Sequence, residues 1–121
     1  MADEITLNMR MQLSNGSLDV DFNPGRLLST QTTQGYFDGV RSIATSETTV
    51  TLSGITTPRQ CILYNMDATN YVEAGTTTAD YPIRLEAGGL PNFLTLNNSK
   101  TTLYLKANTA ACNVRILVLE D

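Results

Sequence analysis

The sequence predicts an all-β protein: a single antiparallel β-sandwich or jelly-roll-like domain of about nine short strands, spanning residues 1–121. Apolar and polar residues alternate in short runs, turn-forming residues recur between the runs, and no helical spacing lasts longer than one turn. A hydrophobic fraction of 41% lies in the globular range, and a chain of this length can bury one core. An up-and-down barrel is the main alternative architecture.

The N-terminal stretch predicts a β-hairpin over residues 5–22. Apolar residues fill every second position from 5 to 13, which predicts a strand with one buried face and one wet face. Asn15-Gly16 is a strong hairpin signal because both positions accept positive φ. Residues 18–22 alternate again, and Asn23-Pro24-Gly25 ends the pattern.

Residues 26–39 have little pattern and are expected to form a loop. A long unpatterned connection in a compact domain is often functional or mobile. It is either an irregular crossover between sheets or, together with the hairpin, a contact arm. Further short strands are expected near residues 40–43, 48–53, 81–85, 93–96, 103–106 and 112–119.

Cys61 to Gly75 is expected to be a second hairpin. Residues 61–64 form a short apolar run without helical spacing, typical of a strand covered on both faces. Asp67–Asn70 supplies turn chemistry, since Asp and Asn side chains hydrogen-bond to their own backbone. Residues 71–73 resume an extended pattern.

The charge, the N-terminal residues and the cysteine content exclude several classes of partner, targeting segment and disulfide scaffold. The net charge is −4, and the eight Lys and Arg residues are scattered, which argues against a nucleic-acid backbone or an anionic membrane as partner. Residues 1–4 lack the basic start of a secretory signal, and no apolar run is long enough to span a bilayer. Cys61 and Cys112 are expected to be buried free thiols.

The chemistry-bearing residues indicate that the protein is not an enzyme and has no cofactor or metal. The chain contains no His, the commonest general base and metal ligand. Asp19 and Asp21 lie about 7 Å apart along a strand, and could form a cation site or catalytic pair, or simply a solvated face. Asp67 and Asn70 could help to hold a cation or serve the turn alone. A hydrolase would require distant carboxylates to converge in a pocket.

The five tyrosines raise a second class of function. Tyr71 and Tyr81 could stack on sugar rings in a carbohydrate-binding module. Partly buried strand tyrosines of an ordinary sheet would give the same pattern.

Several segments from Val40 onward resemble the sequences of a known class of proteins. They are Val40-Arg41-Ser42-Ile43, Thr56-Thr57-Pro58, Asn65-Met-Asp-Ala-Thr-Asn-Tyr-Val-Glu73, Leu85-Glu86-Ala87-Gly88, Leu103-Tyr-Leu-Lys-Ala-Asn-Thr-Ala-Ala111 and Leu117-Val-Leu-Glu-Asp121. Together they resemble small structural proteins in the virions of tailed bacteriophages. The likeness covers about two thirds of the chain and leaves residues 1–35 outside it.

This resemblance implies a virion component without enzymatic activity, assembled in the host cytoplasm as a homo-oligomer, with a trimer favoured. The expected role is a capsid decoration or cement protein on the head exterior, with the major capsid protein as partner. A neck, tail or baseplate protein is the alternative. The candidate capsid-contact residues, all at or near the hairpin and the loop after it, are Asn15, Arg26, Leu27, Leu28, Gln31, Gln34 and Tyr36.

Overall fold

The computed structural model describes residues 4–121, so most of the acidic N-terminal stretch lies outside the described residues. The described chain contains twelve strands and no helix, more strands than the nine or so expected. It divides into two compact units, one ending at Thr32 and the other spanning Thr33–Asp121.

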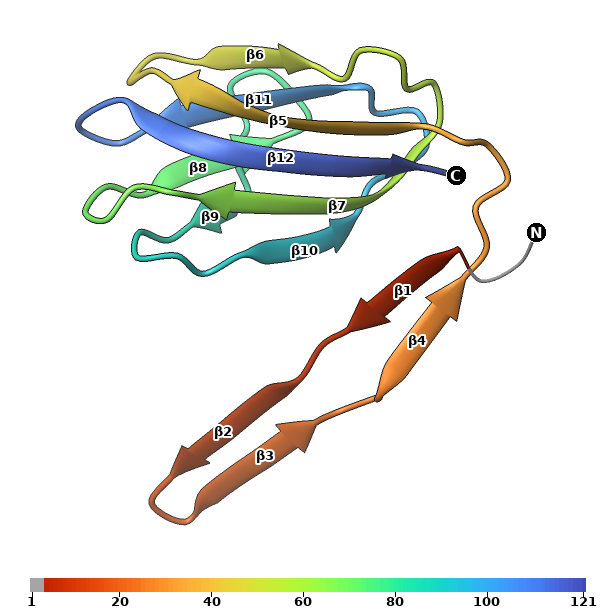
Figure 1. Ribbon diagram of the computed structural model, residues 1–121. Coiled ribbons are helices and arrows are strands. Elements are labelled where there is room, and N and C mark those ends of the chain that lie inside the picture. Colours follow the sequence, from red (N-terminus) through yellow and green to blue (C-terminus); the bar gives the residue numbers. More distant parts are fainter. Residues whose placement is uncertain (1–3) are drawn as a thin grey trace. The chain divides into compact units, whose positions relative to one another are not determined.

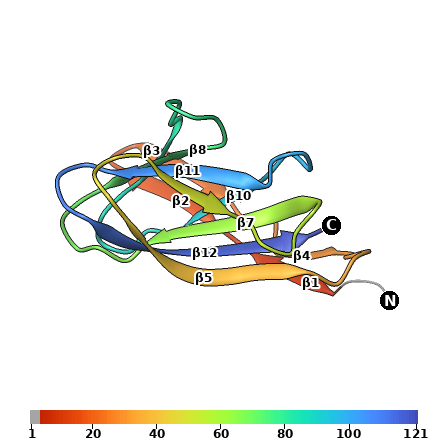
Figure 2. The same ribbon diagram turned by 90° about the horizontal axis from the view of Figure 1, so that it is seen from above.

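The second unit is a sandwich of two four-stranded antiparallel sheets (Figure 1). The first sheet has the order β10-β7-β12-β5, with β5 at Tyr36–Ile43, β7 at Pro58–Asn65, β10 at Asn92–Thr95 and β12 at Cys112–Glu120. The second has the order β6-β11-β8-β9, with β6 at Thr48–Thr51, β8 at Val72–Gly75, β9 at Ile83–Leu85 and β11 at Thr102–Ala107. Figures 1 and 2 both show β12 lying between β5 and β7.

The strand pairing is nested, which is the arrangement of a jelly roll. β8 pairs with β9, β7 with β10, β6 with β11, and β5 with β12, all antiparallel. The eight strands thus form one long folded-back ribbon that is rolled into two layers. The predicted antiparallel sandwich is confirmed. The up-and-down barrel is wrong because the strands form two separate sheets and, apart from β8 and β9, the paired strands are not sequential neighbours.

The core fills the space between these two sheets. In β12, four alternate side chains are almost completely buried: Cys112, Val114, Ile116 and Val118. Facing residues such as Leu85, Leu103 and Leu105 come from the second sheet. Among residues 4–121, the eighteen core residues all lie between Phe37 and Val118, in the second unit.

The segment Cys61–Gly75 is not a hairpin. β7 pairs with β10 and β12, whereas β8 pairs with β9 and β11 in the other sheet. The intervening turn forms as predicted, but it carries the chain across the sandwich. The fully buried Asn65 amide holds this crossover, donating to the carbonyls of Asn70 (2.8 Å) and Leu85 (3.2 Å). Turn chemistry is the same in a hairpin and in such a crossover, so the sequence pattern could not separate them.

The first unit is a two-stranded ribbon. β2 (Met11–Asn15) pairs with β3 (Leu18–Phe22), and β1 (Ile5–Asn8) pairs with β4 (Arg26–Ser29). The hairpin prediction is confirmed for β2 and β3. The loop predicted at 26–39 is wrong at both ends, since β4 and the start of β5 occupy them. The sequence of β4, Arg-Leu-Leu-Ser, does not alternate between apolar and polar residues, and no residue in this strand is fully buried.

The ribbon turn differs in detail from the expectation. Asn15 pairs with Leu18, so the two loop residues are Gly16 and Ser17. Gly16 has φ 60°, whereas Ala79 is the one non-glycine residue with positive φ among residues 4–121. Glycine alone at the first loop position fits a type II′ turn, which matches the twist of the paired strands.

Candidate interaction surface

Cross-strand register places five apolar side chains on one face of the β2–β3 ribbon. Met11 lies opposite Phe22, Leu13 opposite Val20, and Leu18 opposite Asn15. These five residues, here called the apolar ribbon face, are Met11, Leu13, Leu18, Val20 and Phe22. Their exposure ranges from 45% to 76%. They present on the order of 500 Å² of apolar surface, the size of patch that marks interaction sites on soluble proteins.

The opposite face of the same strands is polar. Gln12 lies across from Asp21, and Ser14 lies across from Asp19. Arg10 donates to Asp21 through Nε (3.0 Å) and Nη2 (2.8 Å). Of the interpretations open for Asp19 and Asp21, the solvated face agrees with this geometry, since an arginine already occupies one carboxylate.

The structure thus corrects one sequence expectation about this hairpin. Alternation predicted a buried face, and the two faces do segregate as expected, but the apolar one is exposed. Over the described residues of the first unit (4–32), the ribbon is two strands wide and has no second layer. An isolated two-stranded hairpin is marginally stable in water and gains stability when its apolar face is covered.

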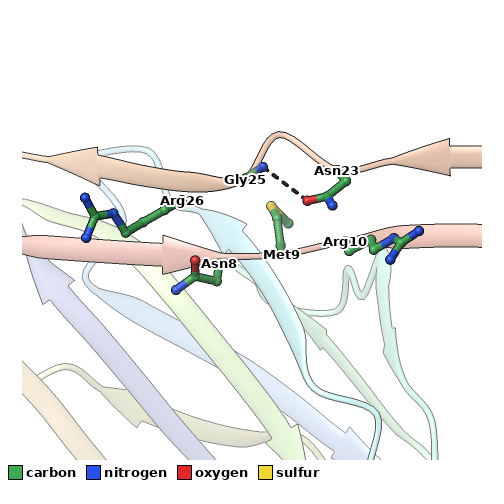
Figure 3. A pocket seen from close by; sticks show the side chains of 6 residues that line it. All are labelled: Asn8, Met9, Arg10, Asn23, Gly25 and Arg26. Carbon is green, nitrogen blue, oxygen red and sulfur yellow. Dashed lines mark hydrogen bonds between the residues drawn. The ribbon is translucent and has the colours of Figure 1, made fainter.

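A bulge joins the two halves of the ribbon (Figure 3). Two residues (9–10) separate β1 from β2, but three (23–25) separate β3 from β4. Gly25 has φ 79°, and its N–H donates to Asn23 Oδ1 (3.2 Å). The hollow beside it measures about 300 Å³ and is lined by Asn8, Met9, Arg10, Asn23, Gly25 and Arg26.

The extra residue in the second strand has a consequence for the side chains. Phe22 is opposite Met11, whereas Leu27 is opposite Leu7. The partner of an odd-numbered residue in the first strand therefore changes from an even to an odd position. Apolar residues therefore lie opposite apolar residues in both halves of the ribbon, and the extra residue of the bulge makes this pairing possible.

The predicted contact residues do not form one cluster. Asn15 ends β2 at the turn, and Arg26, Leu27 and Leu28 lie in β4 opposite β1. The backbone N–H of Gln31 donates to Glu4 Oε2 (3.2 Å) in the same unit. Gln34 and Tyr36 belong to the second unit, where Tyr36 starts β5 and pairs with Leu119. Sequence reasoning omitted the five apolar residues because it assigned them to a buried face.

The Asp67–Asn70 segment is occupied by its own turn. Asp67 Oδ2 accepts hydrogen bonds from the backbone N–H groups of Asn70 (2.6 Å) and Thr69 (3.0 Å). These bonds lower the pKa of the Asp67 carboxyl, with the Asn70 bond as the largest cause. The geometry agrees with the turn role and not with a cation site.

The two tyrosines of the carbohydrate hypothesis are both engaged within the second unit. The Arg84 guanidinium lies 3.7 Å from the centre of the Tyr71 ring. The Tyr81 hydroxyl donates to Glu47 Oε1 (2.6 Å), and this bond is the main reason that the pKa of Tyr81 rises to about 12. Less aromatic surface is therefore free to stack on a sugar.

Cys61 and Cys112 are free and buried, as predicted. Cys61 pairs in register with Val118, near the far end of β12 from Cys112. Burial raises the pKa of the Cys61 thiol to about 12, and burial is also the main cause of the raised pKa of Cys112. Both thiols therefore stay protonated at neutral pH and serve as small core side chains.

Among residues 4–121, no group of three or more His, Cys, Asp or Glu side chains is placed to hold a metal ion. Over the same part of the chain, no helix is long and apolar enough to cross a membrane. No protein-family model matches the chain, and neither the curated proteins nor the solved structures contain a significant match.

Proposed function

We propose that this protein is a structural component of a bacteriophage virion, a decoration or cement protein that binds the head exterior at junctions between capsid subunits. The apolar ribbon face is the observation that carries the proposal. A surface of five exposed apolar side chains on a narrow two-stranded ribbon suits a groove or sheet edge on another protein. The major capsid protein is the proposed partner.

The division of the chain supports this role. The second unit holds the whole core, so its stability does not require the ribbon to bury anything. The ribbon's apolar residues are then available for contact with a partner. Jelly rolls occur in viral capsid proteins but also in lectins and cupins, so the fold agrees with the proposal without deciding it.

Binding would stabilise the shell by mass action. A protein that binds the expanded lattice more tightly than other states shifts the equilibrium toward that lattice. Covering the ribbon face on the capsid removes its apolar surface from water, which is favourable at about 25 cal/mol per Å². Several ribbons on one oligomer would act together and convert a weak contact into firm binding.

The copy number in purified virions tests the location. We expect quantitative mass spectrometry to find one copy per major capsid protein, or a simple fraction of it. A few to a dozen copies per particle would instead place the protein in the neck, tail or baseplate. Absence from the particle would contradict the virion assignment altogether.

A pair of matched variants tests the contact surface. Val20→Lys places a charge on the apolar ribbon face, and we expect at least a roughly tenfold loss of affinity for purified heads because a desolvated charge is costly at an interface core. Ser14→Lys adds the same charge to the opposite face, where it lies across from Asp19, and should bind like the wild type. Equal binding by both variants would remove the ribbon face from the contact.

A further inference from the structure

The outer surface of the sheet β10-β7-β12-β5 is unusually apolar. Phe93, Ile62 and Leu117 follow one another across three strands in register, on the face away from the core. Tyr36 and Val40 on the edge strand β5 are 70% and 50% exposed. The apolar residues of this outer sheet face are Tyr36, Val40, Ile62, Tyr64, Phe93, Leu117 and Leu119. Its polar positions by register include Asp38, Ser42, Gln60, Thr95, Asn113 and Arg115.

The other sheet of the sandwich provides an internal control. Its outward residues include Thr49 and Tyr104 in one row, and Lys106, Glu73 and Arg84 in another. That surface is the ordinary polar exterior of a sandwich. The contrast indicates that the apolar character of the first sheet is specific to that face.

The two charged residues of the outer sheet face form an ion pair with each other. Arg115 donates to Asp38 through Nε (3.0 Å) and Nη2 (2.8 Å), a bidentate ion pair. The Arg115 hydrogen bond is the main cause of the lowered pKa of Asp38, so the pair stays charged at neutral pH. Beside it lies a hollow of about 260 Å³ lined by Ile62, Tyr64, Pro91, Arg115 and Leu117.

We propose that this outer sheet face is covered by a second copy of the same chain. Charge is the first argument for that occupant. The whole chain has a net charge of −4, so two copies repel each other over most of their surfaces. On the outer sheet face the charged residues are Asp38 and Arg115, one of each sign, and two such faces can meet without net repulsion.

The size and composition of the face are the second argument. The four strands contain 8, 8, 4 and 9 residues. At about 4.8 Å between strands and about 3.3 Å per residue they make a face of roughly 20 by 24 Å. Two such faces bury about 950 Å² in total, which is the size of a weak, reversible contact. Tyr, Phe and Arg are enriched in interface cores while Lys and Glu are depleted, which matches this face. Two sheets also pack naturally face to face, as in a sandwich.

The mass of the purified full-length protein in solution tests this proposal, which does not depend on the proposed function. We expect sedimentation velocity to show a dimer that dissociates on dilution, because two identical faces that cover each other close the assembly at two copies. Val40→Asp should raise the dissociation constant at least about tenfold. Val40 lies opposite Arg115, which already pairs with Asp38, so a second carboxylate gives each face a net negative charge and two such faces repel. Thr49→Asp on the polar sheet is the charge-matched control and should assemble as the wild type does.

Each outcome decides the proposal. Loss of assembly in Val40→Asp but not in Thr49→Asp supports it. A wild type that stays monomeric at high concentration overturns it, and so does an oligomer that both variants leave intact. If Val40→Asp does not fold by circular dichroism, Tyr36→Lys takes its place, since Tyr36 is at the strand end and mostly exposed.

Discussion

The ribbon and the sandwich carry the same sequence pattern with opposite results. In β12, successive side chains alternate between the core face and the outer face of the sheet, and Val114 and Ile116 on the core face are fully buried. In β2 and β3 the alternation is equally regular, yet Met11 and Val20 are exposed. The strands differ in what lies opposite them: β12 faces a second sheet across the core, and the ribbon has no second layer in its own unit.

The comparison shows what alternation can and cannot predict. A period of two sorts side chains onto two faces because successive Cβ atoms point to opposite sides of a strand. Burial additionally requires a covering layer, which the local pattern does not encode. An exposed face of this kind is therefore a candidate contact surface for another molecule.

The largest effect that separates the two regions should come from a core truncation. Ile116→Ala removes most of a fully buried side chain, and we expect it to lower the free energy of unfolding by about 2–5 kcal/mol. Val20→Ala on the ribbon should change it by less than about 0.5 kcal/mol, since little contact is lost. Urea unfolding of both variants measures the difference; similar losses would mean that the ribbon residue is buried in solution.

A smaller effect is expected at Glu120, the last residue of β12. Glu120 is only 4% exposed, and its Oε2 accepts hydrogen bonds from the backbone N–H groups of Thr56 (2.7 Å) and Thr57 (3.1 Å). A Cβ on Gly35 would collide with the same carboxylate. The Thr56 backbone bond is the largest cause of the lowered pKa of Glu120.

The lowered pKa of Glu120 determines how the stability of the fold changes with pH. A lowered folded-state pKa means that the charged carboxylate stabilises the fold above its ordinary pKa of 4.5, and that this contribution is lost as the pH falls through the folded value. Glu120→Gln should therefore melt several degrees below the wild type at pH 7. The difference should shrink below pH 4.5 in thermal melts. A difference that stays constant down to acid pH would assign the effect to the shape of the side chain and not to its charge.

The sequence predicted the sandwich well because the sandwich follows local rules. Burial and strand register agree in β11 and β12, so apolar periodicity located them. A short apolar run located β7, but that strand is fully buried on one face only and not on both as expected. It failed at Cys61–Gly75 because a turn between two sheets has the same local chemistry as a hairpin turn. It also missed the buried role of Asn65, whose partners at Asn70 and Leu85 come from separate segments.

The candidate surface was predicted in part. The hairpin at residues 5–22 was proposed as a contact arm, and its turn and β2–β3 pairing are present. Its five apolar residues were not named, because an apolar face in a strand is normally part of a core. The outer sheet face was missed for a related reason: Val40, Tyr64 and Leu117 come from three strands that only the register brings into one row or its neighbour.

The smallest expected effect comes from removing the ribbon, and it tests most directly whether the two units are independently stable. Deleting residues 1–32 should leave the melting temperature of the sandwich nearly unchanged, because every core residue lies beyond Thr33. The cut also keeps the bond from the Thr33 N–H to the Asp121 carbonyl (2.9 Å), which ties the start of this unit to its end. Differential scanning calorimetry of the truncated and full-length proteins makes the comparison. A drop of more than a few degrees would mean that the ribbon stabilises the sandwich, and its apolar face would then be a packing surface as well as a contact surface.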